Sequence, residues 1–167
     1  MLFWVLSAHY SLMIAAGISF ALSLAVNLRS YLKGRPKILE IGSLIFLASL
    51  AVISLFIEPR EIWKSFHMTG NAAMFLTAIL SIALKKPFVL QYARDELPEE
   101  KWNSPRLFRT CLEITWAWAA LFFFMTISSM MIIFWVHPVR WMIWASHTLA
   151  FTGAMAFTRW YRKRAES

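Results

Sequence analysis

The chain alternates between long apolar runs and short polar segments, and five of the runs are long enough to form membrane-crossing helices. A helix needs about 20 apolar residues to cross the hydrocarbon core of a bilayer. The runs cover residues 3–28, 38–57, 66–84, 111–136 and 141–161. Proline follows three of the runs, at Pro59, Pro87 and Pro138, where it cannot continue a helical hydrogen-bond ladder. The pattern predicts an all-α fold: a polytopic membrane helical bundle of about five transmembrane helices, in one membrane domain over residues 1–167.

The distribution of Lys and Arg predicts the orientation of these helices. The first loop, the long loop at 85–110 and the C-terminal tail together hold fourteen of the seventeen Lys and Arg residues. The second and fourth loops hold the other three, and the N-terminal tip holds none. Cytoplasmic loops are enriched in Lys and Arg. We therefore expect an N-out, C-in topology with the 85–110 loop in the cytoplasm. The first run lacks the basic leader of a signal peptide, so we expect a retained helix.

The composition favours lipid as the solvent and argues against a nucleic-acid partner. The chain is 59% hydrophobic and contains nine Trp and fourteen Phe, more apolar surface than one small core can bury. The formal net charge of +8 lies between the apolar runs, as membrane topology requires and as a DNA-binding face would not. We expect most tryptophans to anchor the helix ends at the two headgroup levels.

Small residues at four-residue spacing predict which helices pack together. Helices associate in lipid through close packing and interhelical hydrogen bonds, which small and hydroxylated residues allow. The first, third and fifth runs carry such rows, at Ser7, Ser11, Ala15, Ser19, Ser23 and Asn27, at Thr69, Ala73, Thr77 and Ser81, and at Ser146, Ala150, Ala154 and Thr158. These rows predict a core of helices one, three and five. The aromatic fourth run is expected to face lipid or a partner.

The 85–110 loop is the longest polar segment and the candidate docking site. It begins with alternating apolar and basic residues, has an acidic centre, and returns to apolar sequence after Ser104-Pro105. Basic segments next to a membrane helix attract anionic lipid heads. We expect either a connector lying on lipid heads or a docking surface for a partner or lipid, with these candidate residues: Lys85, Lys86, Tyr92, Arg94 and Trp102.

The four histidines form the second candidate site. His9, His67, His137 and His147 all fall in the outer half of the predicted bilayer or at its surface. Ionisable groups inside a membrane are costly and usually functional. His9, His67 and His147 could meet between helices one, three and five and bind haem b or a transition metal, with His137 as a further metal ligand. The alternatives are interfacial histidines bonded to backbone or water, and a quinone or lipid-head pocket.

Several short motifs resemble the intracellular septation protein A family of bacterial inner-membrane proteins. The similarity runs over about 63–164 and consists of Lys85-Lys86-Pro87, Leu97-Pro98, Trp116-Ala117-Trp118-Ala119 and Ile133-Phe134-Trp135. The segment Phe88–Arg94 departs from the family pattern. The resemblance implies a five-helix protein of the bacterial inner membrane, non-enzymatic and tied to cell-envelope maintenance or division. It implies no catalytic residues.

Three functional hypotheses follow. The first is a structural or scaffolding protein or an accessory subunit, acting with a membrane-protein partner or as a homo-oligomer. The second is a haem- or metal-binding redox subunit that uses the outer histidines, and the third is a small transporter or lipid-handling protein. The sequence has no nucleotide-binding loop, serine nucleophile motif or carboxylate dyad, so we expect no enzymatic activity and no catalytic residues. Glu40 and Glu113 fall in the first turns of predicted helices, where a negative charge complements the helix dipole.

Overall fold

The computed structural model describes residues 12–32, 34–56, 59–135 and 140–166. These ranges contain six α-helices and one short 3-10 helix, and no strand. The elements in chain order are α2 (Leu12–Leu32), α3 (Ile38–Ile53), α4 (Pro59–Ala83), α5 (Phe88–Glu96), η1 (Glu99–Lys101), α6 (Pro105–Trp135) and α7 (Arg140–Glu166). The predicted all-α bundle is therefore confirmed, and each of the five apolar runs corresponds to one long helix.

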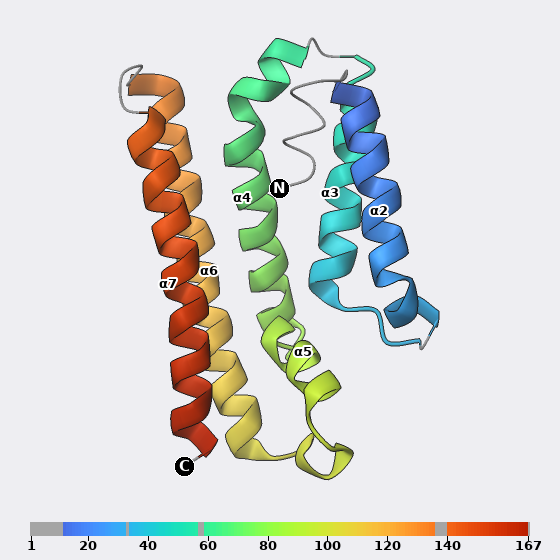
Figure 1. The fold of residues 1–167 in the computed structure, drawn as a ribbon, viewed down its shortest axis with the longest axis vertical. Coiled ribbons are helices and arrows are strands. Elements are labelled where there is room, and N and C mark those ends of the chain that lie inside the picture. The colour runs from blue at the N-terminus through green and yellow to red at the C-terminus, as the bar shows by residue number, and fades with distance from the viewer. Residues whose placement is uncertain (1–11, 33, 57–58, 136–139, 167) are drawn as a thin grey trace.

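The five long helices run up and down in sequence order, with α5 lying across one end of the bundle (Figure 1). The α2–α3 connection, the α4–α6 connection and the C-terminal end of α7 lie at this same end. We call it the basic end, because thirteen of the described Lys and Arg residues lie in the segments there. The C-terminal ends of α3 and α6 and the N-terminal ends of α4 and α7 lie at the opposite end.

Helix α6 occupies the centre of the packing, which differs from the prediction. It packs against α4, α5 and α7, whereas α2 packs against α3 and α3 also contacts α4. The main buried cluster unites Ala78 of α4 and Phe88 of α5 with four residues of α6, namely Ile114, Trp118, Ala119 and Phe122. The prediction that the first, third and fifth long helices, α2, α4 and α7, form the core is thus wrong. One face of α6 holds the core, while Phe123 and Phe124 on its other face are exposed.

Hydrogen bonds between helices reinforce this arrangement. The Trp118 indole N–H donates to Thr158 Oγ1 of α7 at 3.0 Å. Asn71 of α4 donates to Ser129 of α6 at 3.4 Å. The small-residue rows of α4 and α7 do form packing faces, as predicted, but both faces meet α6 or α3 rather than each other.

Membrane-span candidates are fewer than the hydropathy pattern predicts. Among the described residues, Pro105–Met131 is the one helical stretch long and apolar enough to cross a membrane. Met68–Ala83 and Phe88–Glu96 give a second span if the two segments, bent by 76° at their break, are counted together. Helix α3 has 16 residues and is about 24 Å long, shorter than a hydrocarbon core of about 30 Å. The described part therefore offers one or two spanning candidates.

Candidate functional site

Two helices end at the basic end of the bundle with the same backbone conformation. Gly34 (φ 64°) follows α2 and Lys85 (φ 54°) follows α4, and both adopt the left-handed conformation. In each case the next residue's N–H bonds back across the last turn, Arg35 to Ser30 O at 3.0 Å and Lys86 to Ser81 O at 2.9 Å. This is the Schellman pattern, which favours glycine. Lys85 lacks that advantage, so the turn that starts the candidate site carries backbone strain of about 1 kcal/mol or more.

A buried serine turns α5 across the end of the bundle. Ser81 is fully buried, donates to the carbonyl of Ala78 at 2.7 Å, and accepts the backbone N–H of Phe88 at 3.2 Å. The first N–H groups of a helix have no partner within the helix. Because Pro87 precedes α5 and offers no side-chain cap, Ser81 supplies the missing acceptor from the helix before the bend.

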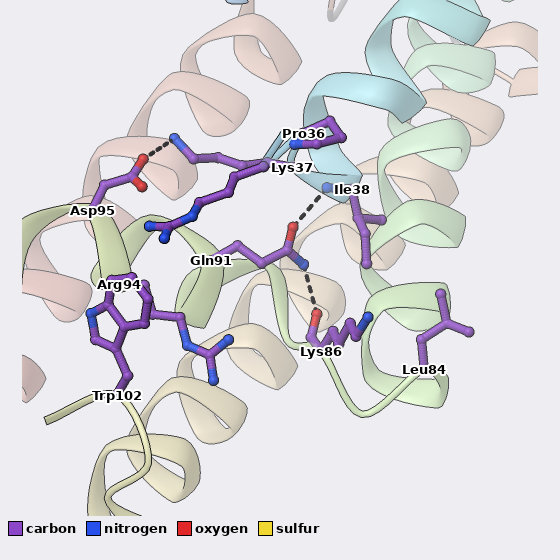
Figure 2. A pocket seen from close by; sticks show the side chains of 10 residues that line it. Pro36, Lys37, Ile38, Leu84, Lys86, Gln91, Arg94, Asp95 and Trp102 are labelled. Atoms are coloured by element: carbon purple, nitrogen blue, oxygen red, sulfur yellow. Dashed lines mark hydrogen bonds and ion pairs between the residues drawn. The ribbon is translucent and has the colours of Figure 1, made fainter. Parts of the chain in front are cut away.

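Gln91 of α5 joins the α2–α3 connection to the α4–α5 bend. Its side-chain oxygen accepts the N–H of Ile38, the first residue of α3, at 2.8 Å. Its side-chain nitrogen donates to the carbonyl of Lys86 at 2.8 Å. Figure 2 shows Gln91 between these two partners. One side chain thus satisfies backbone groups at two helix ends and holds segments about fifty residues apart in contact.

Lys37 is surrounded by two carboxylates and one aromatic ring. Its ammonium lies 2.6 Å from Asp95 Oδ2, 3.6 Å from Glu40 Oε1, and 4.2 Å from the centre of the Tyr92 ring. Glu40 also accepts the backbone N–H of Lys37 at 3.3 Å, so the predicted helix-start role of Glu40 is confirmed. Burial, followed by the negative charges of Glu40 and Asp95, raises the pKa of Tyr92 to about 12. The phenol therefore stays neutral at physiological pH.

A pocket of about 440 Å³ opens between the α2–α3 connection, the α4–α5 bend, α5 and Trp102, the residue after η1. Four of its lining residues are cationic and one is acidic, against a wall of apolar and polar side chains. The lining consists of Arg35, Pro36, Lys37, Ile38, Leu84, Lys86, Gln91, Arg94, Asp95 and Trp102. We call this feature the basic pocket. Figure 2 shows Gln91 in its middle, with Arg94 and Trp102 on one side and Lys86 and Leu84 on the other.

The charges of the basic pocket are unevenly compensated. Lys37 is neutralised by Asp95 and Glu40, and Arg35 lies 3.6 Å from the exposed carboxylate of Glu99. Arg94 and Lys86 have no ion-pair partner among the described residues, and the buried Nε of Arg94 has no hydrogen-bond partner there. A buried donor without a partner costs about 1–3 kcal/mol, more when it is charged. The arrangement can accept an anion.

Three of the five predicted docking residues line the basic pocket. These are Lys86, Arg94 and Trp102. Lys85 instead forms the left-handed turn beside the pocket, and the Tyr92 ring lies beneath Lys37.

Three further residues that line the pocket were not predicted: Arg35, Lys37 and Gln91. The shared basic character of the first and third loops is the signal that could have paired Arg35 and Lys37 with the 85–110 segment. Nothing in the sequence marks Gln91.

The histidine site stays a prediction. His9 and His137 lie outside the described residues, and His67 falls in α4 without a described side chain. His147 of α7 shares a 2.8 Å hydrogen bond with Ser128 of α6. Helices α2 and α7 lie on opposite sides of the bundle (Figure 1). No group of three or more His, Cys, Asp or Glu residues able to hold a metal occurs in the part of the chain that the structure describes.

Comparison of the chain with protein-family models, with curated proteins and with solved structures gave no match.

Proposed function

We propose that this chain is a five-span protein of the bacterial inner membrane, with its N-terminus outside and its C-terminus in the cytoplasm. In this proposal it acts without enzymatic activity, as a structural protein or an accessory subunit in cell-envelope maintenance or division. Its partner is another membrane protein or a second copy of itself.

The observation that carries the proposal is the apolar outer surface of the bundle. Large apolar side chains are exposed along the long helices, among them Val26 at 78%, Leu149 at 72% and Ile45 at 63%. Soluble monomers rarely expose contiguous apolar surface beyond a few hundred Å². Hydrocarbon around the helices removes this cost, because lipid tails are as apolar as the side chains.

The basic end supports the orientation. Among the described residues, the segments rich in Lys and Arg lie at one end of the bundle, and the opposite end carries Arg60, Lys64 and Arg140. Because cytoplasmic loops are enriched in Lys and Arg, this asymmetry supports a cytoplasmic location for the basic end. The short α3 is accommodated by local thinning of the bilayer or by anchoring of its flanking residues, at a cost of fractions of a kcal/mol per Å.

The use of polar side chains inside the bundle supports a structural role. Asn71, Trp118 and His147 each bond to a residue of a neighbouring helix, with Ser129, Thr158 and Ser128 as partners. Interhelical hydrogen bonds in membranes contribute about 0.6–2 kcal/mol each. These groups thus hold helices together. The connection to the cell envelope and division rests on the resemblance of residues 63–164 to the septation protein A family.

The proposal is tested by comparing the chain in its native membrane with the purified chain. We expect cross-linking in native membranes to give a discrete, stoichiometric complex, and deletion of the gene to change cell length or septum placement. Purified protein that absorbs in the visible Soret region, or that alone transports a solute in vesicles, would contradict the proposal. Soret absorbance would instead support the predicted haem site. Loss of the band in His147→Ala would then show that this histidine is needed for it.

A further inference from the structure

We propose that the basic pocket binds the phosphate of an anionic phospholipid, of the phosphatidylglycerol class, from the leaflet at the basic end. This inference rests on the proposed membrane location. The volume of the basic pocket, about 440 Å³, falls within the range of small-molecule sites.

Two arginines from different segments share one tryptophan at the pocket wall. The guanidinium carbon of Arg35 lies 4.9 Å from the centre of the Trp102 ring, and that of Arg94 lies 5.8 Å from it. The Trp102 ring is held by its N–H, which donates to Leu97 O at 3.0 Å. Like charges brought together around one ring repel each other, and an anion between them relieves the repulsion. Planar guanidinium groups match phosphate oxygens with two parallel hydrogen bonds.

The charge balance favours Arg94 as the main phosphate ligand. Lys37 is already paired with Asp95 and Glu40, and among the described residues the carboxylate paired with Arg35 is that of the exposed Glu99. Exposed ion pairs contribute little, so an incoming phosphate can compete for Arg35. Arg94 offers a buried Nε without a partner among the described residues.

The apolar surroundings distinguish a lipid from a dissolved anion. Leu76 and Leu80 of α4 and Leu84, directly after it, follow one another at four-residue spacing. All three are exposed, and Leu84 lines the pocket. On α3, Ile38 lines the pocket, and the exposed Ile41 and Ile45 continue the apolar face away from it. Residues at this spacing lie on one side of a helix. Each helix therefore offers an apolar stripe that leads from the pocket along the bundle, where an acyl chain would lie.

Lys86 fits the same ligand at the rim. Its side chain is exposed, extends toward Leu84 in Figure 2, and has no acidic partner in the described residues. Lysine next to apolar surface keeps its stem on that surface and its ammonium at the headgroup level. The pocket thus combines the buried Nε of Arg94, which can donate to a phosphate, with a cation at the rim and two apolar stripes.

The test uses the purified full chain in nanodiscs made from equal amounts of phosphatidylglycerol and phosphatidylcholine. Native mass spectrometry of the released protein gives the ratio of the two lipids that it retains. We expect the wild type to retain phosphatidylglycerol preferentially and Arg94→Gln to lower the ratio about tenfold, the effect of one lost charge-assisted hydrogen bond. Lys86→Gln changes only an exposed side chain and is expected to lower the ratio severalfold without affecting folding.

Lys101→Gln is the matched control, because it removes the same charge from η1 without touching the pocket lining. Its lipid ratio is expected to equal that of the wild type. The proposal is overturned if the wild type shows no preference, or if Lys101→Gln lowers the ratio as much as Lys86→Gln and Arg94→Gln do. It is also overturned if millimolar inorganic phosphate abolishes the preference, because the ligand is then the dissolved anion.

The outcome of this test does not depend on the topology proposed above. Both leaflets of the nanodisc have the same composition, so lipid preference does not depend on which end of the protein faces the cytoplasm. A reversed orientation in cells would leave this ratio unchanged.

Discussion

Replacing Ser81 with alanine isolates the hydrogen bond that turns α5 across the bundle. The Ser81 hydroxyl is fully buried and accepts the N–H of Phe88 at 3.2 Å, and Phe88 itself is buried. In Ser81→Ala that N–H loses its acceptor and has no access to water. A buried donor left unsatisfied costs about 1–3 kcal/mol. The bond to Ala78 O adds little, since that carbonyl lies within α4. We expect the free energy of unfolding to fall by about 1–3 kcal/mol.

The assay is reversible unfolding in mixed micelles, followed by circular dichroism, together with amide hydrogen exchange at Phe88. Ser43→Ala is the control, because the Ser43 hydroxyl is half-buried and donates to Glu40 O of its own helix at 2.8 Å, its one bond within the described part of the chain. A substitution of this kind changes stability by about 0.5 kcal/mol or less. If Ser81→Ala and Ser43→Ala prove equally stable and exchange at Phe88 is unchanged, the assigned role of Ser81 is refuted.

Three further changes probe the packing and the basic pocket. A Cβ at Gly42 would lie 2.5 Å from Thr77 Oγ1, so Gly42→Ala should lower the free energy of unfolding by about 1–3 kcal/mol in the same assay. In a Thr77→Ala background, which removes that oxygen, the same Gly42→Ala change should cost much less. Gln91→Leu should speed amide exchange at Ile38 about fivefold, the effect of losing roughly 1 kcal/mol of hydrogen bonding, and unchanged exchange would contradict the bridging role. Burial and neighbouring carboxylates raise the pKa of Tyr92 from 10.0 to about 12, so the folded state binds more protons between those values and stability should fall as pH rises through that window. A pH–stability profile of Tyr92→Phe should lack this fall, and a profile identical to wild type would count against it.

The number and order of the five long helices could be predicted from hydropathy, but their ends could not, and neither could the short α5 and η1. Helix α4 begins at Pro59 rather than at residue 66, and α6 begins at Pro105 rather than at residue 111. Proline is favoured in the first turn of a helix because its missing N–H is not needed there. Hydropathy detects only the apolar part of a helix, and these helices continue through polar turns. Helix α3 instead ends early, at Ile53.

The packing partners could not be predicted, for a reason particular to apolar chains. When the surface is as apolar as the interior, hydrophobicity does not indicate which face is buried. On α6 the buried Phe122 and the exposed Phe123 and Phe124 are adjacent and identical in type. The small-residue rows did indicate packing faces, such as Thr158 of α7, but they carry no information about which helix lies opposite.

The candidate docking site was predicted in part. Charge and position pointed to Lys86, Arg94 and Trp102, which line the basic pocket. Arg35 lies about sixty residues earlier in the chain, and only the fold brings it to Trp102. The pocket is therefore a product of tertiary structure.

Cysteine accessibility in intact cells tests the central claim most directly. The native thiol, the buried Cys111, is removed as Cys111→Ala. In this background, Glu61→Cys puts a single thiol in the first turn of α4, and Glu100→Cys puts a single thiol in η1, at the opposite end of the bundle. With a membrane-impermeant maleimide we expect labelling of Glu61→Cys in intact spheroplasts, and of Glu100→Cys only after the membrane is permeabilised. Labelling of Glu100→Cys from outside, or of both thiols before permeabilisation, would contradict a bundle that crosses the bilayer with its basic end in the cytoplasm.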